Sequence, residues 1–394
     1  MTNKILQLDF SNTEIAFKAK TNSELRTSYF LFKAIGINWL VKMGTPLIET
    51  AFALHLPIKR LIKHTVYQQF VGGENIEDCE KAIDNLFKYN IGTILDYSVE
   101  GKESEADFEN TCNETIDTIY KAKGNKKIPF CVFKVTGLAR FSLLEKINSN
   151  ITLNQNETLE FEKVKARIEK ICRVAYENNV RIFIDAEETW IQNPIDNMAT
   201  EMMLKFNKNE AIVYNTIQLY RHDRLAFLNE SFKQAEANNY YLGVKLVRGA
   251  YMEKERARAA ELNYTDPIQT SKENSDADYD NALRFCLENI NRINICAGTH
   301  NENSSRTLAQ MMIDNNIEIN DKRIYFSQLY GMSDNLSFNL ANDGYNVAKY
   351  LPYGPVKDVM PYLFRRAAEN TSVKGQTGRE LNLILKEKAR RAAL

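Results

Sequence analysis

The sequence predicts an α/β protein of the (β/α)8 type, a TIM-type barrel in which eight parallel strands are closed into a ring with helices around it. From about residue 85, short β-rich apolar runs are each followed by a longer stretch with helical periodicity. Polar side chains also fall at or just after the C-terminal ends of separate runs, which is where barrels collect their functional groups. An open, doubly wound sheet is the structural alternative.

The predicted elements follow from this alternation. Eight strands are expected, at Ile91–Tyr97, Pro129–Val135, Arg181–Asp185, Ala211–Leu219, Tyr241–Val247, Ile293–Ala297, Ile324–Gln328 and Asn346–Leu351. Helical patterns lie between them, for example at Leu159–Asn178, Met198–Phe206, Arg224–Asn238, Asp276–Ile290 and Arg306–Asn315. We therefore expect a helical arm over residues 1–84, the barrel over 85–370 and a C-terminal helical tail over 371–394.

Composition excludes several classes of protein. With 44% hydrophobic and 26% charged residues, the 394-residue chain is typical of a globular protein that buries a large core. The 51 basic and 51 acidic residues cancel, which argues against a nucleic-acid partner. The six cysteines have no CxxC pair and no metal-ligand spacing, so we expect a reducing compartment and no metal. Nothing at the N-terminus resembles a secretory signal, and the expected location is a bacterial-type cytoplasm.

The N-terminal arm is basic and amphipathic. Its two apolar stretches, Tyr29–Met43 and Pro46–Pro57, are interrupted by charges and fall short of the ~20 apolar residues of a membrane span. Up to Lys63 the arm carries nine basic residues against four acidic ones. We expect the helices of this arm to cover the barrel, and the alternative is that the arm contacts the inner face of an anionic membrane.

A pair of arginines follows the last predicted strand. The segment Tyr350–Pro355 ends that strand in a Pro/Gly turn, Pro355 is expected to begin a helix, and Arg365 and Arg366 lie inside it. Paired guanidinium groups are suited to clamp a carboxylate, because each donates two parallel hydrogen bonds. Alternatively the pair belongs to a solvated helix face and is neutralised by Glu369.

Other strand ends carry charged or hydrogen-bonding groups. Asp185 ends a buried strand and is expected to point inward, although a helix N-cap is the alternative. Two cations, Lys245 and Arg248, and a glycine that permits close approach, Gly249, lie at the end of the fifth strand. A cation there, beside a flavin, would stabilise negative charge on the reduced ring. His300 after the sixth strand is either a ligand-binding group or a structural histidine. Neither a GxGxxG fingerprint nor a P-loop occurs, so a flavin would have to use barrel loops.

From about Gln69 to Asn370 these segments together resemble the proline dehydrogenase family. The motifs that carry the resemblance are Lys245–Arg256, Gly298–Asn301, Phe326–Met332 and Tyr350–Asn370, in the family's order. The resemblance implies oxidation of L-proline to Δ1-pyrroline-5-carboxylate by hydride transfer to N5 of a non-covalently bound FAD, with a membrane quinone as electron acceptor. The chain ends at Leu394, before the aldehyde dehydrogenase domain of bifunctional relatives, so a separate pyrroline-5-carboxylate dehydrogenase is the expected downstream partner.

The resemblance also implies roles for individual residues. The substrate would contact Lys134, Leu246, Tyr350, Tyr362, Arg365 and Arg366, and Asp185, Lys245 and Tyr350 would act in catalysis. FAD would contact Gln218, Lys245, Arg248, Gly249, Ala250, Tyr251, Thr270, Lys272, Thr299 and His300. The order Lys245 then Arg248 is similar to the mitochondrial-type branch, and Glu100 is the expected counterpart of a glutamate that pairs with the first clamp arginine in relatives.

Two other classes of function remain open at this point. A barrel lyase or aldolase would use Lys134 or Lys245 as a Schiff-base nucleophile, and a binding protein would have no catalysis at all. Within the leading class, hydroxyproline or another cyclic imino acid is the alternative substrate.

Overall fold

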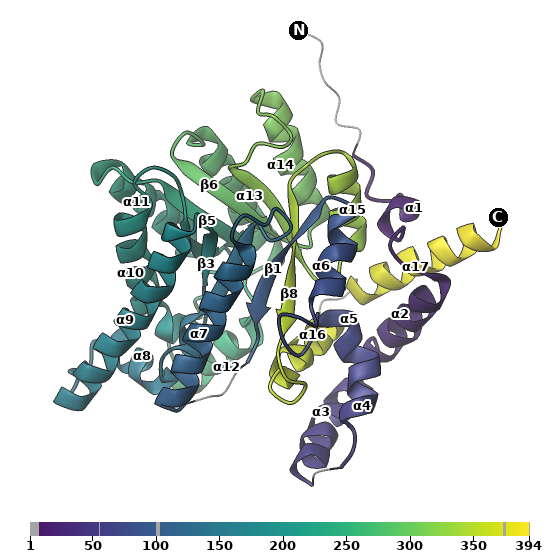
Figure 1. The fold of residues 1–394 in the computed structure, drawn as a ribbon, viewed down its shortest axis with the longest axis horizontal. Coiled ribbons are helices and arrows are strands. Elements are labelled where there is room, and N and C mark those ends of the chain that lie inside the picture. Colours follow the sequence, from purple (N-terminus) through teal and green to yellow (C-terminus); the bar gives the residue numbers. More distant parts are fainter. Residues whose placement is uncertain (1–7, 55, 100–102, 373–375, 394) are drawn as a thin grey trace. The chain divides into compact units, whose positions relative to one another are not determined.

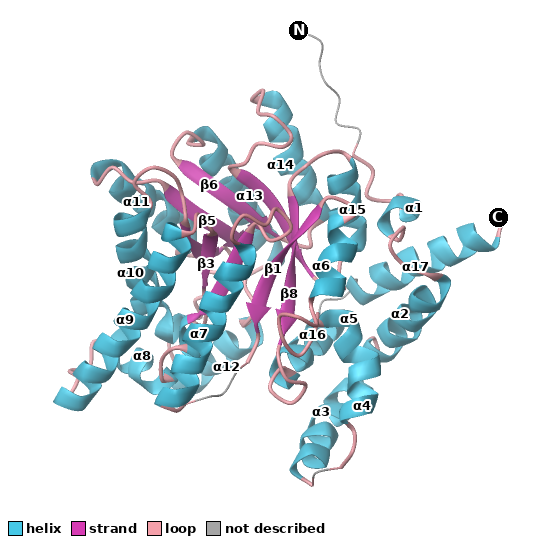
Figure 2. Cartoon of the chain, in the orientation of Figure 1, coloured by secondary structure: helices cyan, strands magenta, loops and turns pink. Residues whose placement is uncertain are grey.

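The computed structural model describes residues 8–54, 56–99, 103–372 and 376–393, without the side chains of residues 38–42, 45, 49, 53, 368–372, 376 and 377. The strands follow one another around a closed barrel in sequence order, from β1 to β8. Helices alternate with the strands along the chain (Figures 1 and 2). The predicted (β/α)8 class is therefore confirmed, and the open sheet is excluded.

The observed strands differ from the predicted ones by no more than two residues at either end. They are β1 (Ile91–Tyr97), β2 (Phe130–Lys134), β3 (Arg181–Asp185), β4 (Val213–Gln218), β5 (Leu242–Val247), β6 (Ile293–Gly298), β7 (Ile324–Leu329) and β8 (Val347–Tyr353). The agreement has a physical reason, because strands covered on both faces are short apolar runs bounded by polar turns.

Of the five helices predicted between the strands, the one at Arg224 begins as predicted, and the other four begin earlier than their apolar periodicity indicates. The observed helices between the strands are α7 (Glu105–Ala122), α8 (Phe141–Asn148), α9 (Gln155–Glu177), α10 (Thr189–Phe206), α11 (Arg224–Ala237), α12 (Met252–Leu262), α13 (Lys272–Glu288), α14 (Glu302–Asp314) and α15 (Asp334–Asn342). Polar caps set several of these starts: Asn154 and Glu157 form a capping box on α9, and Asn301 caps α14.

The chain divides into two compact units, and the first covers the described residues from 103 to 327. Its strands carry a layer of aromatic rings on the face that bears Asp185 and Lys245. Phe130 and Phe183 stack at 4.5 Å, and the rings of Tyr214 and Tyr325 meet Phe130 edge-on at 5.5 and 4.9 Å. This apolar layer lies nearer the N-terminal ends of the strands and leaves the polar groups at the C-terminal ends.

The second unit joins residues 8–99 to residues 328–393. It holds β1 and β8, which pair in parallel, the arm helices and the C-terminal helices. The arm consists of α1 (Thr13–Ala16), α2 (Asn22–Ile35), α3 (Asn38–Ala53), α4 (Lys59–Ile62), a π-helical turn (Lys63–Tyr67), α5 (Gln68–Phe70) and α6 (Glu80–Phe87). None of the helices in the described ranges is long and apolar enough to span a membrane.

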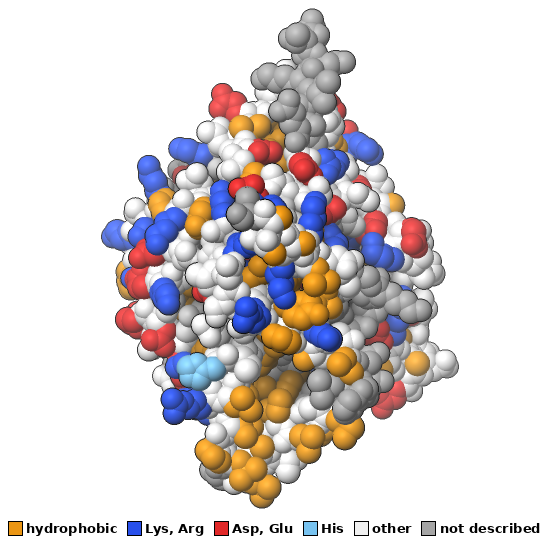
Figure 3. All heavy atoms as spheres, turned by 90° about the vertical axis from the view of Figure 1, so that its right-hand side faces the viewer, with side chains coloured by type: hydrophobic (Ala, Val, Ile, Leu, Met, Phe, Trp, Pro, Cys, Tyr) orange, Lys and Arg blue, Asp and Glu red, His pale blue; other side chains and the backbone are white. Residues whose placement is uncertain are grey.

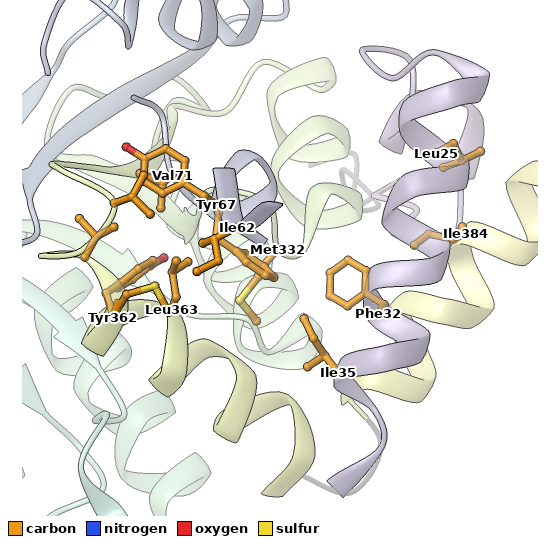
Figure 4. Packing of buried hydrophobic residues seen from close by; sticks show 14 of the residues in the cluster. Leu25, Phe32, Ile35, Ile62, Tyr67, Val71, Met332, Tyr362, Leu363 and Ile384 are labelled. Atoms are coloured by element: carbon orange, nitrogen blue, oxygen red, sulfur yellow. The ribbon is translucent and has the colours of Figure 1, made fainter. Parts of the chain in front are cut away.

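The arm packs on the C-terminal helices α16 (Met360–Ser372) and α17 (Gln376–Ala392). Figure 4 shows part of the apolar cluster between them, which includes Leu25 and Phe32 of α2, Tyr362 of α16 and Ile384 of α17, with Leu25 near Ile384. The sequence prediction that Pro355 begins a helix is wrong, because α16 begins five residues later and Pro355 starts a turn closed by a hydrogen bond from Asp358 N–H.

Candidate active site

Three charged side chains meet at the C-terminal ends of β2, β3 and β5. Lys245 Nζ donates a hydrogen bond to Asp185 Oδ1, and Lys134 Nζ lies 3.8 Å from Asp185 Oδ2. Lys245 is 4% exposed and its ammonium group lies 5.4 Å from the centre of the Phe183 ring. Two ammonium groups thus face the Asp185 carboxylate in partly desolvated surroundings, and such a grouping of cations suits an anionic ligand.

The position of Asp185 settles one sequence alternative. It is the last residue of β3 and is paired in register with Lys134, the last residue of β2. The N-cap of the following helix α10 is Glu188, three residues later. Asp185 therefore points to the inner cations as predicted and does not cap the helix.

Arg248, directly after β5, is the centre of a second polar network. Its guanidinium donates to Asp276 Oδ1 at 2.6 Å, Thr299 Oγ1 at 2.8 Å and Ser304 Oγ at 2.9 Å, and lies 4.4 Å from the centre of the Tyr279 ring. Burial acts to raise the pKa of Asp276, but the hydrogen bond from Lys272 and the charge of Arg248 outweigh it and hold that pKa below its ordinary value. Arg248 is thus fixed in one orientation at a strand end.

This network joins three predicted cofactor residues, Arg248, Lys272 and Thr299. It also contains Asp276, which the sequence analysis did not single out. Arg248 and Lys272 both contact Asp276, and Thr299 accepts from Arg248. Thr270 lies at the same end of α13 and accepts from Asn274 Nδ2 at 3.0 Å. The available signal for Asp276 was its spacing, because an acid four residues after Lys272 in a helix lies beside it.

Gly249 and Gln218 have the features expected of a cofactor cradle. Gly249 has φ +145°, and a Cβ there would lie 2.3 Å from Cε1 of Tyr220, so only glycine fits. Gln218 is 2% exposed at the end of β4, and its Oε1 accepts no hydrogen bond from any described residue. A buried acceptor of this kind requires an N–H or O–H donor from a ligand or from water. The residues present therefore fit a flavin, whose pyrimidine ring carries such an N–H.

One predicted site residue is misplaced. Successive side chains of a strand point to opposite faces, and Lys245 points to Asp185. Leu246 therefore lies on the other face of β5, where it is fully buried. The structure contradicts the prediction that Leu246 walls the substrate together with the side chains on the face of Lys245.

Three other predicted cofactor residues belong to loops of this unit. Ala250 is exposed, Tyr251 is partly buried just before α12, and His300 is partly buried after β6. No group of three metal-binding side chains occurs among the described residues.

The second unit carries the remaining predicted substrate residues. Tyr350 on β8 and Tyr362 on α16 are 7% and 5% exposed, and Arg366 is 6% exposed with its guanidinium carbon 5.3 Å from the centre of the Tyr362 ring. Arg365 is partly buried. The arginines therefore do not form a fully solvated helix face. The side chain of Glu369 and all of Glu100 lie outside the described residues.

Glu187 is a buried acid beside the cluster that the sequence analysis did not identify. Thr136 N–H donates to Glu187 Oε1 at 3.0 Å, and Thr136 Oγ1–H is hydrogen-bonded to Oε2. Burial and the charge of Glu188 raise the pKa of Glu187 to about 7. This side chain anchors the loop after β3 to the end of β2, and it favours the protonated form.

We predict that Glu187 makes the protein less stable as pH rises from about 4.5 to about 7. Its pKa is higher in the folded chain, so the folded state binds the extra proton, and its contribution is complete at low pH and lost toward neutral pH. The full shift corresponds to about 3 kcal/mol. Unfolding free energies from urea titrations at several pH values should show a flatter profile for Glu187→Gln, whose amide oxygen still accepts from Thr136 N–H and whose NH2 group can donate to Thr136 Oγ1. Parallel profiles for the two proteins would contradict this assignment.

Comparisons with known proteins agree with the fold and the motifs. The family model described as proline dehydrogenase matches residues 79–379. Proline dehydrogenase 1, mitochondrial, from Dictyostelium discoideum is 31% identical over 99% of this chain and 76% of the relative. The carbapenem antibiotics biosynthesis protein CarD from Pectobacterium carotovorum is 31% identical over 82% of this chain and 83% of the relative.

Among solved structures, proline utilization A from Bdellovibrio bacteriovorus, inactivated by N-propargylglycine, is similar with a TM-score of 0.72 and 21% identity. The match covers 94% of this chain and 40% of that chain, so the protein spans less than half of its structural relative. At this identity the likeness supports the barrel fold alone.

Proposed function

Because the chain belongs to the proline dehydrogenase family, we propose that it oxidises L-proline to Δ1-pyrroline-5-carboxylate with non-covalently bound FAD and passes the electrons to a membrane quinone. The observation that carries this proposal is the cationic cluster of Lys134 and Lys245 on Asp185 at the C-terminal strand ends. A fixed positive charge there both attracts a carboxylate and disfavours a protonated amine. Both effects serve the oxidation of an amino acid.

FAD would supply the hydride acceptor. We propose that the buried carbonyl of Gln218 accepts a hydrogen bond from the flavin ring, and that Lys245, Gly249, Ala250 and Tyr251 lie along the cofactor. The remaining proposed contacts are Arg248, Thr270, Lys272, Thr299 and His300, of which Arg248, Lys272 and Thr299 are already joined through Asp276. Pre-formed donors cost little to order when the cofactor binds.

For the substrate we propose that Lys134, Arg365 and Arg366 bind the carboxylate and that Tyr350 and Tyr362 contact the pyrrolidine ring. Asp185 holds the ammonium groups of Lys134 and Lys245 in place. The C5 hydride leaves with two electrons only while the nitrogen lone pair is free, and the resulting iminium loses a proton to give the imine. The protein's own contribution is mainly orientation of C5, a form of catalysis by proximity.

The direct test is a product assay. Purified protein, L-proline and an electron-accepting dye should give dye reduction together with an imine that condenses with o-aminobenzaldehyde. The rival lyase or aldolase predicts a covalent adduct at Lys134 or Lys245 after borohydride treatment and no dye reduction. The same assay with 4-hydroxyproline decides between the two imino acids. The product would pass to a separate pyrroline-5-carboxylate dehydrogenase.

The arm carries an exposed apolar face that supports contact with a membrane. Seven of the seventeen large apolar side chains exposed among the described residues lie between Phe30 and Leu61. We call this set the arm patch; it consists of Phe30, Ile37, Met43, Leu47, Leu54, Leu56 and Leu61. Figure 3 shows apolar side chains gathered on the lower part of the face that carries the arm.

The charges near the arm patch favour an anionic lipid surface. Lys33 lies on α2, Lys59 and Arg60 lie on α4, and Lys63 begins the π-helical turn that follows. Glu74 pairs with Lys59 at 2.9 Å and with Lys63 at 2.7 Å. Up to Lys63 the arm carries nine basic residues against four acidic ones, a basic excess of the kind found in amphipathic helices at membrane surfaces. We propose that the arm patch docks on the inner face of a cytoplasmic membrane, from which the quinone reaches the flavin.

We predict that the double variant Leu47→Glu/Leu61→Glu loses at least about tenfold in affinity for phosphatidylglycerol-containing vesicles, because two exposed leucines no longer enter the lipid. Vesicle sedimentation measures this, and dye-linked turnover should not change. Leu159→Glu, on α9 and 58% exposed, is the matched control. Unchanged binding of the double variant would contradict the docking. If the wild-type protein instead forms dimers that the double variant dissociates, the patch is an interface between copies of this chain.

A further inference from the structure

The loop after β3 contacts α12, the helix that directly follows the proposed cofactor segment Gly249–Tyr251. This loop joins Asp185, the last residue of β3, to Thr189, the first residue of α10, and its last residue, Glu188, and Thr189 contact consecutive residues of α12. Lys254 donates a hydrogen bond to Glu188, and Glu255 accepts two from Thr189. We call these two pairs the α12 contact.

Glu255 is the buried half of the α12 contact. Its side chain is fully buried, and it accepts from Thr189 N–H at 2.8 Å and from Thr189 Oγ1–H at 2.6 Å. Thr189 is the first residue of α10, whose N-cap residue Glu188 makes no side-chain capping bond. Glu255 therefore caps α10 from another helix, where a carboxylate is favoured by the unpaired N–H groups and the helix dipole.

Burial raises the pKa of Glu255, and the two hydrogen bonds from Thr189 oppose that shift. A carboxyl group so fully removed from water is stabilised only while its donors stay in place. Movement of α12 away from Thr189 would leave the acid without those donors. The pair is therefore sensitive to the position of the helix, as a contact between two solvated side chains would not be.

The exposed half of the α12 contact is reinforced by aromatic rings. The ammonium group of Lys254 lies 5.7 Å from the ring centres of both Phe141 and Trp190. One turn further along α12, the Arg258 guanidinium lies 4.4 Å from the Trp190 ring and pairs with Glu145. Positions 254, 255 and 258 thus fasten α12 to α8 and to the start of α10.

The loop after β3, which α12 contacts, is itself held in place by hydrogen bonds. Glu187 binds Thr136, Asp185 binds Lys245, and Gln192 Oε1 accepts from Glu187 N–H at 2.8 Å. On the other side of the cofactor segment, Arg248 is fixed by Asp276 and Thr299. The three residues Gly249–Tyr251 therefore lie between an immobilised arginine and an immobilised helix.

We propose that Glu255 is a positioning residue: by capping α10 from α12, it fixes the segment Gly249–Tyr251 relative to the loop of Asp185 and so retains the flavin. This rests on the proposed function only for the identity of the ligand. Loss of the cap releases one end of the cofactor segment while Arg248 still holds the other. The expected effect is faster cofactor release, with local loosening of residues 249–262.

The test compares Glu255→Ala with Glu253→Gln, which changes an exposed neighbour on the same helix. In the flavin-loaded protein, Glu255→Ala should release FAD at least tenfold faster, measured by the return of free-flavin fluorescence after dilution. Hydrogen exchange should rise over residues 249–262 and at the start of α10. Glu253→Gln should match the wild type in both measurements. Equal FAD release and equal exchange in Glu255→Ala and wild type would overturn the proposal.

A milder pair of variants separates positioning from folding. Thr189→Val removes the hydroxyl donor to Glu255 and keeps the backbone one, whereas Thr189→Ser keeps both. Thr189→Val should release FAD faster than Thr189→Ser, which should behave like the wild type. If Glu255→Ala loosens the whole chain, a rise in hydrogen exchange in Thr189→Val that is confined to residues 249–262 still supports the proposal. The absence of any such rise would refute it. If the protein binds no flavin, the proposed function fails, while hydrogen exchange still tests the contact.

Discussion

Arg366→Met should raise the Michaelis constant for L-proline by about 30-fold or more, corresponding to a loss of ~2–4 kcal/mol in binding. Arg366 is 6% exposed, so an ion pair with a carboxylate forms there with little competition from water. Methionine retains most of the apolar stem beside Tyr362 and removes the charge. Steady-state kinetics at saturating dye measure the change, and Arg365→Met should act in the same direction.

The control for this prediction is Arg173→Met, which removes an arginine that is 54% exposed on α9. Its Michaelis constant for proline should equal that of the wild type, and the flavin content of all variants should be the same. An unchanged Michaelis constant in Arg366→Met, at full flavin content, would show that this guanidinium does not bind the substrate.

The second large effect is on stability. Lys349→Met should lower the free energy of unfolding by about 3 kcal/mol, because it breaks a buried ion pair and leaves the Asp334 carboxylate with only Lys20, whose Nζ lies 3.6 Å from Asp334 Oδ2. Lys349 is fully buried; its Nζ lies 2.7 Å from Asp334 Oδ1 and donates to the carbonyl of Met332 at 2.7 Å. The carbonyl of Leu329 accepts from it as well, at 3.4 Å.

Chemical unfolding of the two proteins measures the difference. In the double variant Lys349→Met/Asp334→Asn the loss should be smaller than in Lys349→Met alone, because the buried negative charge is gone as well. Lys357→Met, at an exposed position, is the control and should unfold as the wild type does. A loss below about 1 kcal/mol in Lys349→Met would show that the buried pair does not stabilise the segment after β7.

The barrel was predictable from the sequence because its strands are buried on both faces. Each strand is a short apolar run, and β1 and β3 have the predicted bounds. Helix starts were less predictable, because polar caps such as Asn154 and Ser271 begin α9 and α13 before their apolar periodicity is visible. Pro355 was misjudged for a related reason: its fixed φ suits a turn as well as a first helical residue.

Site residues could be predicted where a charged side chain falls at the end of a predicted strand. They could not be predicted where their role depends on a partner far away in the sequence. Asp185 and Lys245 end or approach the end of strands, and the structure pairs them over 60 positions of sequence. Leu246 was assigned wrongly because a motif does not reveal which face of a strand a residue occupies. Glu187 and Glu255 were missed because their partners, Thr136 and Thr189, lie 51 and 66 positions away and only the fold brings them together.

The most direct measurement of the central claim is the visible absorption spectrum of the purified protein under anaerobic conditions, before and after addition of L-proline. A tightly bound flavin should give the yellow absorption of oxidised FAD, and proline should bleach it at a rate that matches turnover with dye. A colourless protein that FAD does not restore, or a flavin spectrum that proline leaves unchanged, would contradict the proposed oxidation.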